Sequence, residues 1–260
     1  MSDLRLATLG PLLTPDAPAK AAATLALDAN AAVDIAAQIA EPAGIPGRPL
    51  RPALVGHTAL ASPSMRTPAG IAALVHAIAH IELNAIDLAL DLCWRFAGMP
   101  TEFYRDWVRI AQEEAKHFTL LRNHLVSLGF DYGDFDAHNA LWDMAERTKH
   151  DLLARIALVP RTLEARGLDA SPAVKRKLIG AGDARAGAII DVILQDEIGH
   201  VAAGNRWYRH LCTERGLDPH TTYAELAARH QAPKLRAPFN LEARRAAGFD
   251  EAELSALTAP

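Results

Sequence analysis

Two Glu-x-x-His motifs constrain this chain most strongly. They are Glu114-Ala-Lys-His117 and Glu197-Ile-Gly-His200, and each lies inside a stretch with apolar 3.6-residue periodicity. On a helix, residues i and i+3 share a face, so each motif presents a carboxylate and an imidazole to the same side. A single motif of this kind is usually accidental, so the surroundings of each one decide its meaning.

A lone glutamate precedes each motif at nearly the same distance. Glu82 lies 32 residues before Glu114, and Glu164 lies 33 residues before Glu197. The helical neighbours of all four glutamates are mainly apolar, which places the carboxylates on core-facing sides of their helices. Burying such charges without a partner would cost several kcal/mol each. A bound cation is the simplest compensation.

The donor set has the composition of a two-metal site. One glutamate from each of two helices and Glu-x-x-His from each of two others is the ligand set of ferritin-like bundles. We therefore predict that two metal ions are bound by six residues: Glu82, Glu114, His117, Glu164, Glu197 and His200. Carboxylate-rich ligation with one imidazole per metal favours two iron ions, with manganese as the alternative, because structural zinc sites favour cysteine.

The apolar periodicity predicts an all-α protein with no β-strands. Long helices are expected over residues 67–96, 101–128, 138–166 and 183–215. The third is expected to bend near Pro160 and to end at Gly167, before a short helix that begins at Pro172. We predict a ferritin-like four-helix bundle over 67–215. An N-terminal helix over 18–40 and a proline-rich wrapping arm form residues 1–66, and a C-terminal extension over 216–260 packs on the bundle.

Composition and charge exclude several classes of protein. The net charge of −4 argues against a general polyanion binder, so a nucleic-acid partner is disfavoured. Between Arg206 and Arg245 the chain has eight Lys and Arg residues and four Asp and Glu residues. We interpret this local excess of positive charge as a solvated surface. Charged residues interrupt every apolar helix, so no membrane span is expected. The N-terminus does not resemble a signal peptide, which predicts a cytoplasmic protein.

Two further sets of residues have simpler interpretations. Cys93 and Cys212 lie in apolar helical patterns and are expected to be buried free thiols. His76 and His80 share a helix with Glu82, but His80 lies on a different face. We therefore expect these two histidines to have hydrogen-bonded packing roles.

Four segments resemble one family over nearly the whole chain. The segments HAIAHIELNAIDLALD, AQEEAKHF, LVPRTLEARGLDASP and DEIGHVAAGNRWYRH are similar to the ferritin-like family catalogued as domain of unknown function 455. That family has no established reaction, so the resemblance supports the fold and the ligands alone. In similar di-iron proteins an acid before the Glu-x-x-His glutamate often hydrogen-bonds the opposite imidazole, which implies that role for Glu113 and Asp196.

The leading functional hypothesis is an oxidoreductase of the monooxygenase or hydroxylase type. The reduced metal pair would activate dioxygen and the substrate would be a small molecule. A tRNA-modifying hydroxylase and a non-catalytic iron storage or detoxification protein are the alternatives. The chain contains no CxxC…CxxC module, so an external electron donor is expected. The substrate and the oligomeric state stay open, with a homodimer as one option.

Overall fold

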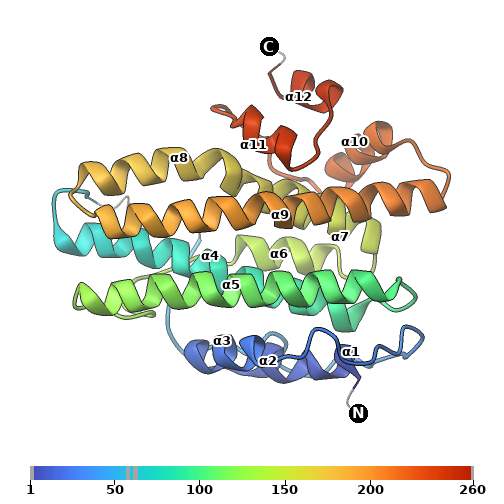
Figure 1. The fold of residues 1–260 in the computed structure, drawn as a ribbon, viewed down its shortest axis with the longest axis horizontal. Coiled ribbons are helices and arrows are strands. Elements are labelled where there is room, and N and C mark those ends of the chain that lie inside the picture. Colours follow the sequence, from blue (N-terminus) through green and yellow to red (C-terminus); the bar gives the residue numbers. More distant parts are fainter. Residues whose placement is uncertain (1–2, 57–58, 61–63, 259–260) are drawn as a thin grey trace. The chain divides into compact units, whose positions relative to one another are not determined.

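The computed structural model describes residues 3–56, 59–60 and 64–258. Over these residues the protein is all-α, as predicted, and its one β feature is an isolated parallel bridge between Leu54 and Ala137. The chain forms two compact units, Met1–Trp142 and Asp143–Pro260. The helices that lie within the first unit are α1 (Leu4–Ala7), α2 (Leu9–Leu13), α3 (Ala17–Leu25), α4 (Pro68–Arg95) and α5 (Thr101–Ser127) (Figure 1).

α4 and α5 form a helical hairpin at the centre of the first unit. Thr67 caps α4 by accepting a hydrogen bond from the Gly70 N–H at 3.1 Å, and Pro68 occupies the first helical position. The chain turns at Gly98, and α5 ends at Ser127, two residues before Gly129, which has φ +86°. The Phe130 N–H then donates to the Leu125 carbonyl, as in a Schellman motif. These sequence-encoded ends set the length over which the two helices pack.

The N-terminal segment is held on α4 by buried cations. Lys20 forms an ion pair with Asp87 and donates to the Gly47 carbonyl at 2.9 Å. Arg5 donates to the carbonyl of Trp94 at 2.9 Å and to that of Cys93 at 3.2 Å, at the last turn of α4. Each buried donor therefore has an acceptor, which removes most of the cost of burying it.

The expected helix over 18–40 is shorter than predicted. It forms α3, which ends at Leu25, and the chain then continues in turns. The Asp28 carboxylate accepts from the Asn30 N–H, and the Asp34 carboxylate accepts from the Ala36 N–H, both at 3.0 Å. Short polar side chains that bind nearby backbone N–H groups compete with helical hydrogen bonds, so the alanine pattern does not continue as a helix.

By length and composition alone, α4 could cross a membrane. Its most apolar 18-residue window has a mean hydropathy of 1.5, and 61% of that window is buried inside the structure. The helix also carries Asp87 and Asp91, which are paired with Lys20 and Arg95. Internal ion pairs and apolar contacts of this kind are the features of a core helix.

The second unit is built around a long interrupted helix and a partner that packs along it. The helices that lie within it are α7 (Leu152–Leu158), the π-helix η2 (Val159–Glu164), α8 (Ala165–Gly180), α9 (Ala184–Glu214), α10 (Pro219–Arg229), α11 (Leu241–Ala246) and α12 (Glu251–Thr258). α6 (Ala140–Arg147) contains the boundary between the units. The stretch predicted as one helix over 138–166 is therefore broken, because Asp151 caps a new helix after a turn at 148–150.

The predicted helix end at Gly167 is wrong, since α8 runs through Gly167 and Pro172 to Gly180. Pro172 cannot donate to the Leu168 carbonyl four residues earlier. That carbonyl accepts instead from the Asn240 side-chain amide at 3.3 Å. A residue distant in the sequence thus replaces the donor that proline lacks, and the helix continues.

The C-terminal segment packs on α8 and α9. Its apolar residues form a core cluster with both helices: Ala165, Leu168, Val201, Ala243, Ala247, Phe249 and Leu254. Two buried arginines accompany this cluster. Arg244 binds both oxygens of Asp169, at 2.9 and 2.6 Å, and Arg161 forms an ion pair with Glu253.

Candidate metal centre

The first unit brings three of the predicted ligands together. Glu82 comes from α4, and Glu114 and His117 come from one turn of α5, with ligand atoms within 4.8 Å of one another. The His117 Nδ1 lies 3.2 Å from a Glu82 oxygen and 3.3 Å from a Glu114 oxygen. The exposed fractions of the three residues are 5%, 2% and 0%. Two carboxylates and an imidazole thus converge in a buried place, as the sequence predicts.

The electrostatics of this cluster favour a cation. Burial, together with the neighbouring Glu114 charge, raises the pKa of Glu82 well above its usual value. Burial lowers the pKa of His117, but the hydrogen bonds that its ring donates to the Glu114 and Glu82 carboxylates outweigh burial and raise that pKa to about 10. The carboxylates therefore stabilise positive charge at this position. A metal ion supplies such charge while the imidazole binds it in neutral form, so the residues fit a metal.

The second Glu-x-x-His motif forms a similar pair on α9. The His200 Nδ1 lies 3.3 Å from a Glu197 oxygen, and the two residues are 1% and 8% exposed. Gly167 of α8 passes close by, since a Cβ built on it would lie 3.7 Å from the Glu197 side chain. A Cβ on Gly204 of α9 would lie only 3.1 Å from Pro160. Glycines therefore allow α9 to approach the neighbouring helical stretch near this motif.

Glu164 is the last residue of the π-helix η2 and is half-buried. η2 contains Pro160, and the Thr162 hydroxyl donates to the Ala157 carbonyl at 2.7 Å. π-helical turns are rare and often occur at functional sites, because the extra residue re-aims the side chains that follow. The sequence predicts a bend near Pro160 but not the π-helix. Pro160 is the residue that indicates an irregular helix at this place. The role of Glu164 as a ligand stays a prediction.

The two acids expected to hold the ligand imidazoles are also half-buried. Glu113 precedes Glu114 on α5, and Asp196 precedes Glu197 on α9. Their predicted bonds to the opposite histidines stay predictions.

His76 and His80 have the packing roles expected for them. The Tyr132 hydroxyl lies 2.7 Å from Nδ1 of His80, whose Nε2 lies 3.0 Å from the His138 carbonyl. His76 stacks on Tyr132, and its Nε2 accepts from the Gly133 N–H at 2.9 Å. Because Nε2 of His76 is an acceptor, this ring is neutral.

Stability should fall as acid protonates His76. Burial lowers its pKa from 6.5 to about 4, although Asp134 and Asp136 oppose the shift. Between pH 6.5 and pH 4 the unfolded chain therefore binds more protons than the folded one. The free energy of unfolding falls across this window, by up to about 3 kcal/mol at pH 4. Urea unfolding across this window should show a shallower pH dependence in His76→Gln.

The control for this comparison is His150→Gln, since His150 is exposed in the turn before α7. That variant should retain the pH dependence of the unmodified protein. An equally steep fall in His76→Gln would show that other groups cause the acid sensitivity.

A third cluster has ligand-like spacing but a different explanation. His220, Asp250 and Glu253 in the second unit have potential ligand atoms within 4.8 Å of one another. Glu253 already pairs with Arg161 and Arg209, and the first two residues are exposed. These arginines supply the positive charge, so we do not assign a metal here.

Comparison with known proteins finds one family that spans nearly the whole chain, including both Glu-x-x-His motifs. The sequence model of a family described as protein of unknown function (DUF455) matches residues 13–255. An uncharacterized protein of Haemophilus influenzae is 47% identical over 213 residues, which cover 79% of this chain and 74% of that protein. No solved structure matches the chain.

Proposed function

Because the chain belongs to the DUF455 family and carries two buried Glu-x-x-His motifs, we propose that it is a ferritin-like di-iron carboxylate protein. In this proposal the cluster of Glu82, Glu114 and His117 is one half of a dinuclear centre. Glu164, Glu197 and His200 supply the other half. The observation that carries the proposal is the buried convergence of two carboxylates on one imidazole in the first unit.

The charges of the six residues support two divalent ions. Four ionised glutamates carry four negative charges, and two divalent cations balance them. Each metal would take oxygen donors and one imidazole, which suits iron and, as the alternative, manganese. The sequence repeats the order glutamate, then Glu-x-x-His, with Glu82 before the first motif and Glu164 before the second. Each unit therefore contains two glutamates and one histidine of the proposed ligand set.

We further propose that the protein is an oxygen-activating oxidoreductase with a small-molecule substrate and an external electron donor. Iron in the reduced state would supply the reactivity toward dioxygen. The chain would supply the carboxylates that bind the ions and an apolar lining that limits water. In the first unit this lining includes Trp107, Ala111 and Phe118, which lie on α5 and are at most 1% exposed.

The test is the reaction of the ferrous protein with dioxygen. Anaerobically loaded protein, mixed with oxygenated buffer, should oxidise its iron within the protein and stop at about two ions per chain. Oxygen uptake and absorbance would be recorded for the unmodified protein, for Glu114→Ala and for the control Glu102→Ala, an exposed residue of α5. Only Glu114→Ala should lose the reaction.

Two outcomes would contradict the proposal. Continued uptake of iron far beyond two ions per chain, with mineral formed, would favour storage or detoxification. An iron-loaded protein that does not react with dioxygen would not be an oxygen-activating enzyme. Either result would leave the metal assignment intact and change the function assigned to it.

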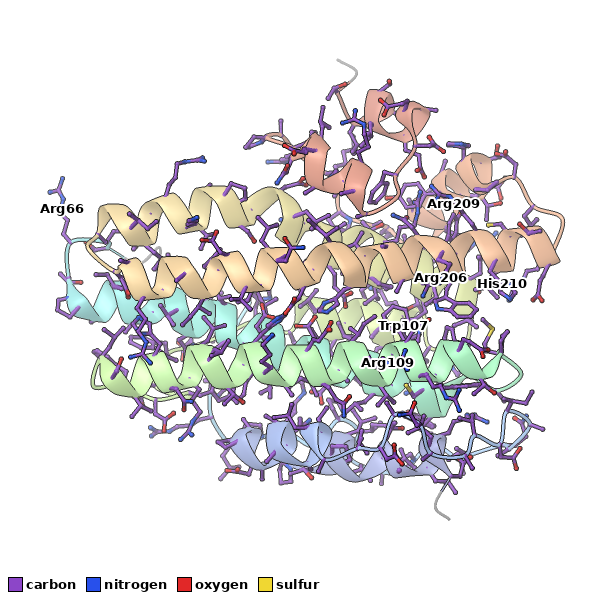
Figure 2. All side chains as sticks on the ribbon, viewed as in Figure 1. Arg66, Trp107, Arg109, Arg206, Arg209 and His210 are labelled. Atoms are coloured by element: carbon purple, nitrogen blue, oxygen red, sulfur yellow. The ribbon has the colours of Figure 1, made fainter. Side chains whose placement is uncertain are left out.

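The placement of basic residues weakens the tRNA alternative. Arg244 is buried against Asp169, and Arg245 pairs with Glu251. Figure 2 shows Arg206 and Arg209 on α9, where Arg209 also donates to the Gly248 carbonyl at 2.6 Å. Much of the local excess of positive charge is therefore engaged within the protein. Extended phosphate binding needs several free cations along one surface.

A further inference from the structure

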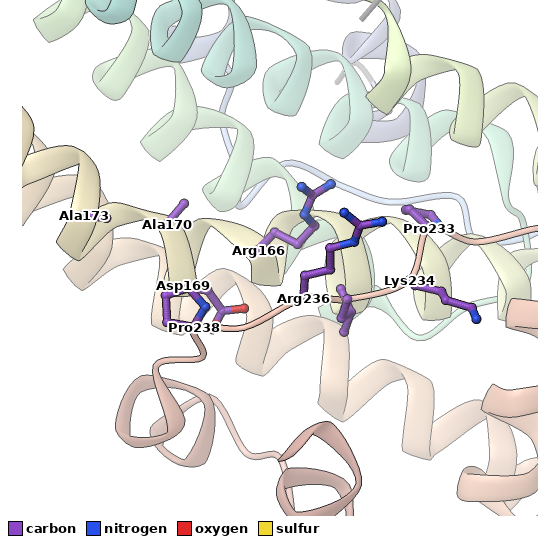
Figure 3. Close-up of a pocket in the computed structure, with 9 residues that line it drawn as sticks. Arg166, Asp169, Ala170, Ala173, Pro233, Lys234, Arg236 and Pro238 are labelled. Carbon is purple, nitrogen blue, oxygen red and sulfur yellow. The ribbon is translucent and has the colours of Figure 1, made fainter. Parts of the chain in front are cut away.

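The second unit contains an open pocket of about 570 Å³ that is separate from the Glu-x-x-His motif in its lining (Figure 3). Its walls are one side of α8 and the segment that precedes α11. The lining residues are Arg166, Asp169, Ala170, Ala173, Pro233, Lys234, Leu235, Arg236 and Pro238. A volume of this size is typical of sites for small molecules.

The charge of the pocket is positive and uncompensated. Arg166, Lys234 and Arg236 are exposed, and none of the three forms an ion pair with a residue that the structure describes. In the view of Figure 3 the side chains of Arg166 and Arg236 point to the same side, whereas Lys234 extends away. Like charges that line one pocket repel each other, and an anion bound in that pocket would remove this cost.

Asp169, the one acid of the lining, does not supply this anion. Its two oxygens accept from Arg244 at 2.9 and 2.6 Å, and one also accepts from the Asn240 N–H at 2.9 Å. Arg244 is 1% exposed, so this ion pair is internal to the protein. The negative charge of the pocket wall is therefore already neutralised.

The same ion pair fixes the pocket before any ligand arrives. Arg244 and Asn240 attach the C-terminal segment to α8, at Asp169 and at the Leu168 carbonyl. The segment that carries Arg236 leads directly into this attachment. The two walls are thus held together by buried hydrogen bonds, which lowers the conformational cost of binding.

We propose that this pocket binds the phosphate group of a small phosphorylated organic molecule. Arg166 and Arg236 donate to the phosphate oxygens, since the planar guanidinium group matches phosphate in paired hydrogen bonds. Ala170, Ala173 and Leu235 offer an aliphatic wall to the organic part. A nucleic acid would need a longer row of cations. The proposal goes beyond the metal centre and does not rest on it.

Calorimetric titration with inorganic phosphate and with phenyl phosphate tests the proposal. Both probes should bind at one saturable site at millimolar concentration, phenyl phosphate more tightly because it also contacts the aliphatic wall, and phenol should not bind. The double variant Arg166→Gln with Arg236→Gln should weaken binding at least about tenfold, since each lost charge-assisted hydrogen bond typically costs that much. Thermal unfolding would establish that the variant is folded.

The matched control is Arg176→Gln, because Arg176 is exposed on the same helix and lies outside the pocket. Equal weakening in this control would mean non-specific charge attraction and would overturn the proposal. So would the absence of saturable binding, or full affinity in the double variant, which would place the phosphate elsewhere. If phenyl phosphate binds no more tightly than phosphate, the ligand is not a phosphorylated organic molecule. If bulk tRNA binds while both probes do not, a small-molecule ligand is ruled out.

Discussion

Replacing either Glu82 or Glu197 by alanine is expected to remove both metal ions from the iron-loaded protein. In a dinuclear centre with shared carboxylates, losing one ligand weakens the binding of both ions. The unmodified protein should retain about two ions per chain after desalting, and each variant should retain well under one. Elemental analysis of the desalted proteins measures this directly.

The pair of variants also distinguishes one shared centre from two separate sites. Glu82 lies in the first unit and Glu197 in the second. If the two sites were independent and mononuclear, each variant would lose one ion and keep the other. Retention of two ions in both variants would show that the assignment is wrong. Glu102→Ala, at an exposed position of α5, should keep the full metal content.

The parts of the fold that depend on local sequence could be predicted. Thr67 and Asp183 cap α4 and α9 with their side chains, and Gly129 ends α5. The i, i+3 spacing places Glu114 beside His117 without any tertiary information. Local rules therefore predicted α4, α5 and α9, and the pairing of Glu114 with His117 in the candidate site.

The parts that were missed depend on contacts between distant residues. Proline and glycine rules predicted a helix end at Gly167 and a helix start at Pro172, but the Asn240 amide supplies the missing donor to α8. No local pattern reveals that partner. Likewise Pro160 indicated a disturbance before Glu164, yet whether the helix would kink, end or widen into η2 depends on its packing.

Charge counting had a similar limit. In a count of charges along the sequence, Arg244 and Arg236 contribute equally to the basic stretch from Arg206 to Arg245. In the structure Arg244 is buried in an ion pair with Asp169, whereas Arg236 is exposed at the rim of a pocket. One arginine stabilises the fold and the other is available to a ligand. Burial and pairing, which composition does not contain, make that distinction.

The variant Glu253→Gln is expected to destabilise the second unit by about 3 kcal/mol, because breaking a buried ion pair leaves a charge without its partner. Arg161 is 4% exposed, and burial lowers its pKa. Its guanidinium lies 4.6 to 5.2 Å from the ring centres of Tyr208, Tyr223 and Phe249. The rings offset part of the loss through cation–π attraction. Urea unfolding at constant pH measures the change.

The matched control is Glu251→Gln, two residues earlier, where the glutamate pairs with Arg245 in solvent. Exposed ion pairs contribute little, so this variant should unfold at nearly the same urea concentration as the unmodified protein. Glutamine at position 253 keeps an oxygen that can accept from the Asp250 N–H, so the start of α12 is preserved. A destabilisation no larger than that of the control would mean that the aromatic rings alone stabilise Arg161, and the ion pair would then contribute nothing to holding the C-terminal segment in place.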